Sequence, residues 1–156
     1  MGQEIERKFL VKSDGWRTAA TGHSWIVQGY LSSNDKATVR IRIFDGARAV
    51  LTLKGAIQGY SRPEYEYDVP IEDARELMEL AQPHVIEKRR HEVLHHGMRW
   101  EVDVFAGKHE GLVLAEIELE TEEQAIALPD WIGREVSDDG RYYNAALSRE
   151  DAPPDA

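Results

Sequence analysis

Charged and apolar residues alternate along most of the chain, and this period of two predicts antiparallel β-strands with two unlike faces. In the first such stretch Glu4, Glu6 and Lys8 point to one face, and Ile5 and Phe9 point to the other. A charged face on a single strand is usually a solvated face, but here the same pattern recurs along the chain. It predicts strands over residues 3–12, 25–32, 37–44, 48–54, 62–69, 84–95, 98–105 and 112–120.

Three other segments have the spacing of helices. Ile71 and Leu77 lie at helical intervals within residues 70–81, and Pro83 ends that segment. Two shorter helices are expected, one after a Thr121–Gln124 capping box over residues 121–128, the other over residues 142–147.

These elements fit one domain. A chain of 156 residues is long enough to bury one sizeable core, and no repeat or linker divides it. An eight-stranded antiparallel sheet tends to close on itself, because closure removes its unpaired edges. We therefore predict an α+β, mainly β, fold over residues 1–149: an eight-stranded antiparallel closed tunnel, or β-barrel, with a few peripheral helices. Residues 150–156 are expected to form a disordered tail.

Composition narrows the classes of function. The net charge is −10, which argues against a nucleic-acid binder because such a protein carries a basic surplus. Cysteine is absent, so disulfides and thiolate metal sites are excluded. No apolar run approaches the length of a membrane helix, and no signal peptide opens the chain. We therefore expect a cytoplasmic protein that binds neither nucleic acid nor membranes.

The polar faces of the predicted strands are almost entirely ionic. If the sheet closes with its aliphatic residues outward, beneath the helices, these charges line the lumen. Unpaired ions are costly to bury, so acidic and basic side chains could simply compensate one another. The basic group nevertheless exceeds what one small anion needs, and it suits a polyphosphate whose charge is shared with divalent cations held by the carboxylates. This basic group consists of Lys8, Arg40, Arg42, Lys54, Lys88 and Arg90.

An ordered series of motifs resembles the CYTH domain family, the triphosphate tunnel metalloenzymes. Glu4-x-Glu6-x-Lys8 is similar to the family's N-terminal signature. Residues 141–144, Arg-Tyr-Tyr-Asn, resemble the C-terminal segment of its short bacterial members. The resemblance covers nearly the whole chain, because the segments between these motifs look like the family's successive tunnel strands. Those segments are Arg40-Ile-Arg42, Thr52-Leu-Lys54, Glu64-Tyr-Glu66, Glu87-Lys88-Arg89-Arg90, Trp100-Glu-Val-Asp103 and Ala115-Glu116-Ile-Glu118-Leu.

The resemblance implies a tunnel that binds a small-molecule triphosphate together with Mg or Mn. Basic residues would hold the phosphate chain, and carboxylates would hold the metal. Hard divalent cations take oxygen ligands, which two pairs of carboxylates spaced i, i+2 on facing strands can supply. The expected metal ligands are Glu4, Glu6, Asp103, Glu116 and Glu118, with Glu64 and Glu66 as additional tunnel carboxylates.

The resemblance also bears on the reaction. Activities in the family include hydrolysis of inorganic, thiamine and nucleoside triphosphates, and cyclisation of ATP to cyclic AMP. This short chain looks like the small bacterial inorganic triphosphatases, so we expect metal-dependent hydrolysis of inorganic tripolyphosphate. Two alternatives stay open: an adenylyl cyclase of the same fold, which needs a pocket for adenine and ribose, and a non-catalytic module that binds polyphosphate or nucleotides. A homodimer is an assembly that the sequence allows.

Lys54 and Tyr30 are the expected catalytic residues. In similar tunnel triphosphatases a lysine and a tyrosine at matching positions are implicated in catalysis, and parity places both on the polar face. A lysine among many positive charges would have a lowered proton affinity and could assist the attacking water. The alternative is that Lys54 is one more phosphate ligand and that Tyr30 packs at the tunnel mouth.

Overall fold

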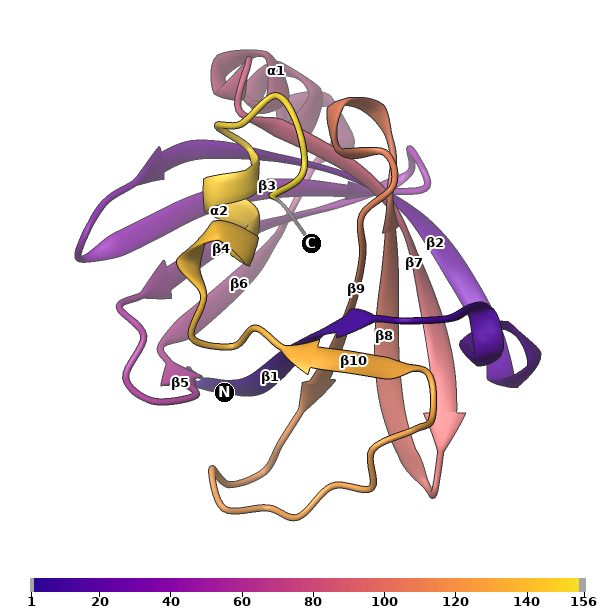
Figure 1. The fold of residues 1–156 in the computed structure, drawn as a ribbon. Coiled ribbons are helices and arrows are strands. Elements are labelled where there is room, and N and C mark those ends of the chain that lie inside the picture. The colour runs from indigo at the N-terminus through magenta and orange to yellow at the C-terminus, as the bar shows by residue number, and fades with distance from the viewer. Residues whose placement is uncertain (1, 155–156) are drawn as a thin grey trace.

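The computed structural model describes residues 2–154, and its strands form one antiparallel sheet (Figure 1). The mainly β, antiparallel fold expected from the sequence is confirmed. The strands are β1 (Glu4–Val11), β2 (Ala20–Ser33), β3 (Ala37–Phe44), β4 (Arg48–Gly55), β5 (Ser61–Arg62), β6 (Glu64–Val69), β7 (Val85–His95), β8 (Met98–Phe105), β9 (Val113–Glu118) and β10 (Ile132–Glu135).

Hydrogen-bonded neighbours follow one another round this sheet from β1 to β6, and the short β5 links that end back to β1. From β1 the order runs through β9, β8, β7, β2, β3 and β4 to β6. β5 and β6 are separated by Pro63, so that β6 pairs with β4 while β5 pairs with the first residues of β1. The backbone N–H of Glu6 also donates to the Tyr60 carbonyl at 3.1 Å, beside this short ladder. β10 pairs with the later residues of β1, so β1 is the strand at which the tunnel closes.

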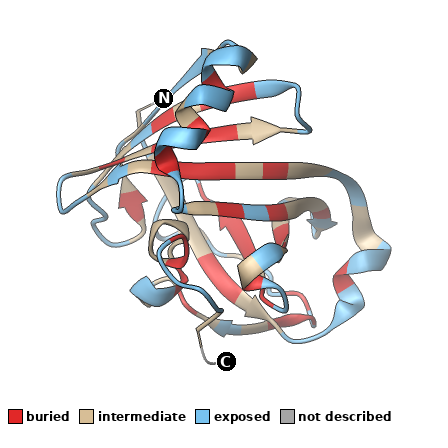
Figure 2. Ribbon diagram, turned by 90° about the horizontal axis from the view of Figure 1, so that it is seen from above, coloured by how far each residue is buried: buried red, intermediate tan, exposed pale blue. Residues whose placement is uncertain are grey.

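Helices cover parts of the outer surface. α1 (Ile71–Ala81) packs on the aliphatic face of β2, β3 and β4, where Ala74 and Met78 join Ile41 and Ala49 in a buried cluster. Figure 2 shows buried residues along the middle of the strands and exposed residues in the connecting loops. The remaining helices are the 3-10 helices η1 (Asp14–Ala19), η2 (Gly107–His109) and η3 (Gly140–Tyr142), and the short α2 (Asn144–Leu147).

The structure corrects the sequence prediction around residues 121–135. No helix forms over residues 121–128. The Gln124 side chain does reach back to accept a hydrogen bond from the Glu120 N–H at 2.6 Å, but it caps a turn. Ile126 then packs against a core cluster from a stretch without regular secondary structure, residues 124–129. β10 was not predicted, because a four-residue strand containing Gly133 gives little alternation to detect.

The start of β2 differs from the predicted boundary, and the predicted disordered tail is not tested. β2 begins at Ala20 rather than at residue 25. Residues 20–24 pair with residues 90–93 of β7, although their sequence is polar and contains glycine. Residues 150–154 form no helix or strand, and residues 155–156 lie outside the described part of the chain, so the disordered tail stays a prediction. Within residues 2–154, the helices are too short or too polar to cross a membrane.

We predict that Gly29→Ala destabilises the fold by forcing α1 away from β2. An added Cβ would lie 2.6 Å from the Cβ of Ala81 and 2.8 Å from the sulfur of Met78. Overpacking of this kind costs roughly 1–3 kcal/mol. Gly22→Ala is the matched control, because on the same strand its added Cβ would meet no atom within 4 Å. Urea unfolding measures both variants, and equal stabilities would contradict the close approach of helix and strand.

Candidate active site

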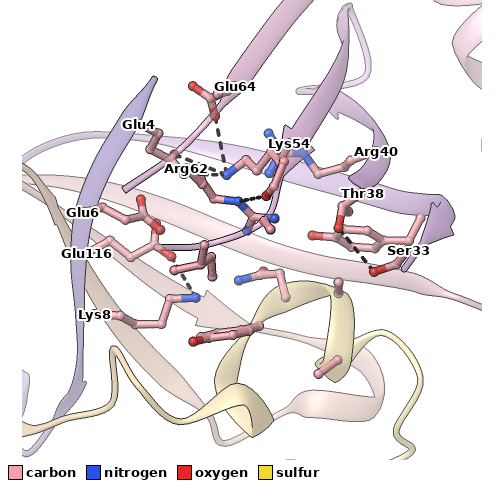
Figure 3. Close-up of a pocket in the computed structure, with 18 of the residues that line it drawn as sticks. Glu4, Glu6, Lys8, Ser33, Thr38, Arg40, Lys54, Arg62, Glu64 and Glu116 are labelled. Atoms are coloured by element: carbon pink, nitrogen blue, oxygen red, sulfur yellow. Dashed lines mark hydrogen bonds and ion pairs between the residues drawn. The ribbon is translucent and has the colours of Figure 1, made fainter. Parts of the chain in front are cut away.

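The tunnel encloses a cavity of about 730 Å³ whose wall is densely charged. Eight basic and nine acidic side chains line it, so the cavity is close to electrically balanced although the whole chain carries a net charge of −10. Figure 3 shows Glu4, Glu6 and Lys8 projecting into it from β1, toward Arg40 and Lys54 from the opposite wall.

The structure brings together all but one of the residues singled out from the sequence. The exception is Asp103, which does not line the cavity. The residues that do line it are Glu4, Glu6, Lys8, Tyr30, Arg40, Arg42, Lys54, Glu64, Glu66, Lys88, Arg90, Glu116 and Glu118.

One wall of the cavity is rich in carboxylates because β1 pairs with β9. The register sets Glu6 opposite Glu118 and Lys8 opposite Glu116. Burial raises the pKa of Glu6 to about 8, and the neighbouring Glu116 and Glu4 carboxylates add to the shift. Glu6 forms no ion pair with any residue in the range 2–154. A buried carboxyl group beside two others, with no cation of its own, is a place that a hard divalent cation would stabilise.

Two other carboxylates of this wall, those of Glu4 and Glu116, already have cationic partners. The Glu116 carboxylate lies 3.4 Å from the Lys8 ammonium and 3.1 Å from the Arg90 guanidinium. Burial alone would raise the pKa of Glu116, but these two cations lower it to about 2. In this arrangement, no three His, Asp or Glu side chains within residues 2–154 are grouped closely enough to hold a metal ion. The donor chemistry fits a hard cation, and binding one requires the carboxylates to exchange their present partners.

Asp103 lies behind the wall and holds two cations in place. It is 1% exposed, and its oxygens lie 2.7 Å from the Lys88 ammonium and 2.8 Å from the Arg90 Nε. Burial opposes ionisation, but Arg90 and Lys88 lower the pKa of Asp103 well below its ordinary value. Asp103 is therefore a charged anchor for the cavity cations, and its expected role as a metal ligand stays a prediction.

Arg40 and Arg42 on β3 carry donors that the described residues leave unused. Arg40 forms one ion pair, at 3.7 Å with the half-exposed Glu66 carboxylate. Arg42 forms no ion pair with the described residues, and its Nε donates to Gln28 Oε1 at 2.8 Å. Burial, together with the positive charges of Arg40 and Arg90, lowers the pKa of Arg42 to about 9. The Nε of Arg40 is buried without a hydrogen-bond partner among the described residues. Crowded guanidinium groups with unused donors are suited to an anion such as phosphate.

The surroundings of Lys54 differ from those expected. Its ammonium lies 2.9 Å from Glu4 and 3.4 Å from Glu64, so its nearest charged neighbours are carboxylates. The expectation that positive charges crowd this lysine is wrong. The reason is that β4 pairs with β6, whose Glu64 lies directly opposite Lys54.

Tyr30 lines the cavity as expected, but the chain around it is irregular. The pairing of β2 with β3 shifts register between Tyr30 and Ser32. Simple alternation places Ser32 on the polar face, whereas the bulge brings Ser33 to the cavity. There the Ser33 and Thr38 hydroxyls lie 3.2 Å apart. Strand periodicity carries no signal for such a bulge.

Several wall residues were not anticipated as site residues. They come from segments without strand periodicity or from positions whose partners only the fold reveals. Asn144 reaches the cavity from α2, and its Oδ1 accepts hydrogen bonds from Lys88 at 2.9 Å and from Gln28 at 3.1 Å. The unanticipated charged residues of the wall are Asp35, Arg62, Glu101, Asp138 and Arg149.

Comparison with known proteins gives a consistent result. The family model described as CYTH domain matches residues 2–148. An inorganic triphosphatase of Acetivibrio thermocellus is 47% identical over 148 residues, which cover 94% of this chain and 94% of that protein. An inorganic triphosphatase of Nitrosomonas europaea is 38% identical over 151 residues, covering 93% of this chain and 96% of that protein.

A solved structure shares the fold. A crystal structure described as that of an inorganic triphosphatase superposes with a TM-score of 0.68 at 34% identity, covering 94% of this chain and 98% of that chain. The similarity therefore extends over the whole tunnel.

We predict opposite stability effects from two arginines of this cavity. Arg90→Ala should destabilise the empty protein by about 3–5 kcal/mol, because it leaves buried Asp103 and Glu116 with less cationic compensation. Arg40→Ala should be at least as stable as wild type, because its one ion pair, at 3.7 Å, is with a half-exposed Glu66 and its buried Nε has no partner among the described residues. Urea unfolding without metal or phosphate measures both. An Arg40→Ala loss as large as that of Arg90→Ala would indicate a structural ion-pair network at Arg40 instead.

Proposed function

The chain belongs to the CYTH domain family, and from this premise we propose that it is a divalent-metal-dependent inorganic triphosphatase. The observation that carries the proposal is a cavity with a carboxylate wall on β1 and β9 facing two arginines on β3. Of these, Arg42 has no ion pair with the described residues, and Arg40 has one at 3.7 Å with half-exposed Glu66. Relatives named inorganic triphosphatase, 47% and 38% identical over almost the whole chain, support it.

The phosphate chain would bind first to Arg40 and Arg42. The Nε of Arg42 donates its hydrogen bond to Gln28, so the two terminal nitrogens of the guanidinium remain available for phosphate oxygens. Lys8, Lys54 and Arg90 are paired with carboxylates in this structure, so they would turn to phosphate only when those carboxylates take another partner. Lys88 is fully buried and bonded to Asp103, and burial lowers its pKa to about 7. It would reach phosphate only by exchanging that partner.

The carboxylates would take Mg or Mn as that other partner. Glu4, Glu6, Glu116 and Glu118 supply the oxygen donors that hard cations prefer. When bound, such a metal neutralises phosphate charge and polarises the bond to be broken. Asp103, the fifth expected ligand, could join them only by giving up bonds that both of its oxygens make to Lys88 and Arg90.

The reaction would be attack of water on a terminal phosphorus of tripolyphosphate. The P–O bond to the neighbouring phosphate breaks, and the products are orthophosphate, pyrophosphate and a proton. The Lys54 side chain forms ion pairs with Glu4 at 2.9 Å and with Glu64 at 3.4 Å. We therefore propose that it acts as an ammonium on the phosphoryl group, where negative charge is redistributed in the transition state.

Product analysis tests the function directly. The protein is incubated with tripolyphosphate, ATP or thiamine triphosphate, first with Mg and then with Mn, and phosphate and cyclic AMP are measured. The proposal expects phosphate release from tripolyphosphate to be the fastest reaction, abolished by a chelator and restored by added metal. Cyclic AMP from ATP would favour the cyclase alternative, and tight tripolyphosphate binding without turnover would favour a binding module.

We predict that Lys54→Ala lowers kcat for tripolyphosphate by roughly a hundredfold or more. The reason is that the lysine charge would be used most strongly in the transition state. Tyr30→Phe should lower kcat less and shift the preference among triphosphate substrates. Steady-state kinetics at saturating metal measures both variants.

The control for this prediction is Arg40→Ala, which should mainly raise KM because phosphate binding in the ground state depends on it. If Lys54→Ala keeps the wild-type kcat and raises KM alone, Lys54 is a phosphate ligand and its catalytic role is rejected.

A further inference from the structure

Gln28 is a buried polar residue that lies behind the cavity wall. It is on β2, its exposed fraction is 0%, and it does not line the cavity. Its amide nevertheless bonds to three residues that do. Oε1 accepts from Arg42 Nε at 2.8 Å, and Nε2 donates to the Tyr30 hydroxyl at 2.9 Å and to Asn144 Oδ1 at 3.1 Å.

The orientation of this amide follows from its partners. Arg42 can only donate, so the atom of Gln28 that faces it must be the carbonyl oxygen. Asn144 is oriented in the same way, because its Oδ1 also accepts from the Lys88 ammonium at 2.9 Å and the ammonium can only donate. A reversed Gln28 would set its NH₂ group against Arg42 and its oxygen against Asn144 Oδ1. Two cations therefore fix both amides.

This fixed amide determines what the Tyr30 hydroxyl can do. The hydroxyl accepts a hydrogen bond from Gln28, and no residue in the range 2–154 accepts one from it. Tyr30 lines the cavity, so its own O–H hydrogen is left to be donated into the lumen.

We propose that Gln28 is a positioning residue, which directs the Tyr30 hydroxyl as a donor toward substrate phosphate while it orients the Arg42 guanidinium. The inference rests on the proposed triphosphatase function and deepens it. Gln28 does not contact substrate, and its effect passes through two residues that do. The substitution that removes the donor from Gln28 is Gln28→Glu. It also ends the hydrogen bond to Asn144, but a loss at Asn144 that does not depend on the Tyr30 hydroxyl cancels in a double-mutant cycle. A carboxylate accepts from Arg42 as the amide does, but it also accepts the Tyr30 O–H and so withdraws that donor from the lumen.

A double-mutant cycle between Gln28→Glu and Tyr30→Phe tests this role. The kcat/KM for tripolyphosphate is measured in wild type, in each single variant and in the double variant. The added negative charge weakens phosphate binding whether or not the Tyr30 hydroxyl is present, so that part cancels in the cycle. We expect Gln28→Glu to reduce kcat/KM by a factor at least roughly ten times larger when Tyr30 is present than when Phe replaces it. Gln124→Glu, the same change in the loop after β9, should leave kcat/KM at the wild-type value.

Equal reductions in the two backgrounds would overturn the proposal, because Gln28 would then act on activity independently of the Tyr30 hydroxyl. Thermal unfolding checks that each variant folds. If Gln28→Glu does not, Gln28→Met replaces it in the same cycle: methionine fills a similar volume but neither donates nor accepts strongly, and independence from Tyr30 again rejects the role. An inactive wild type would reject the proposed function and this inference together, whereas an active wild type with equal reductions rejects the role of Gln28 alone.

Discussion

Charge compensation inside the tunnel is the constraint on which the rest of the structure depends. A closed sheet turns one face of every strand inward, so each charged residue of that face must find a partner or remain solvated in the cavity. Antiparallel pairing supplies many of the partners: Lys8 lies opposite Glu116, and Lys54 lies opposite Glu64. The fold therefore tolerates a cavity wall of mostly ionic residues, because neighbouring strands bring opposite charges together.

The compensation is incomplete at Glu6 and at Arg42. These two residues suit the metal and the phosphate chain of the proposed ligand. Glu6 lies among carboxylates, and its pKa is raised to about 8, whereas Arg42 lies among cations, and its pKa is lowered to about 9. A divalent cation would stabilise the first group and a phosphate oxygen the second. Binding would thus replace internal ion pairs with carboxylate–metal and arginine–phosphate contacts, while Asp103 keeps Lys88 and Arg90 in position.

Strand periodicity made much of the cavity predictable, because alternate residues necessarily face the same side of a sheet. That rule located Arg40 and Arg42 correctly, and it predicted a mainly β fold. It failed where the chain departs from regular geometry, as at the bulge that brings Ser33 to the cavity. It was also silent about partners across the tunnel. The carboxylates around Lys54 and the bond from Gln28 to Tyr30 depend on register and closure, which alternation within one strand does not encode.

The most direct test of the account is the position of metal and phosphate in the cavity. Crystals grown with Mn and a non-hydrolysable imido analogue of tripolyphosphate would locate the metal by its anomalous scattering. The account predicts a manganese peak among the carboxylates of β1 and β9, bridged by the analogue to Arg40 and Arg42. Manganese and analogue bound outside the tunnel, or an analogue in the cavity that contacts neither arginine, would contradict it.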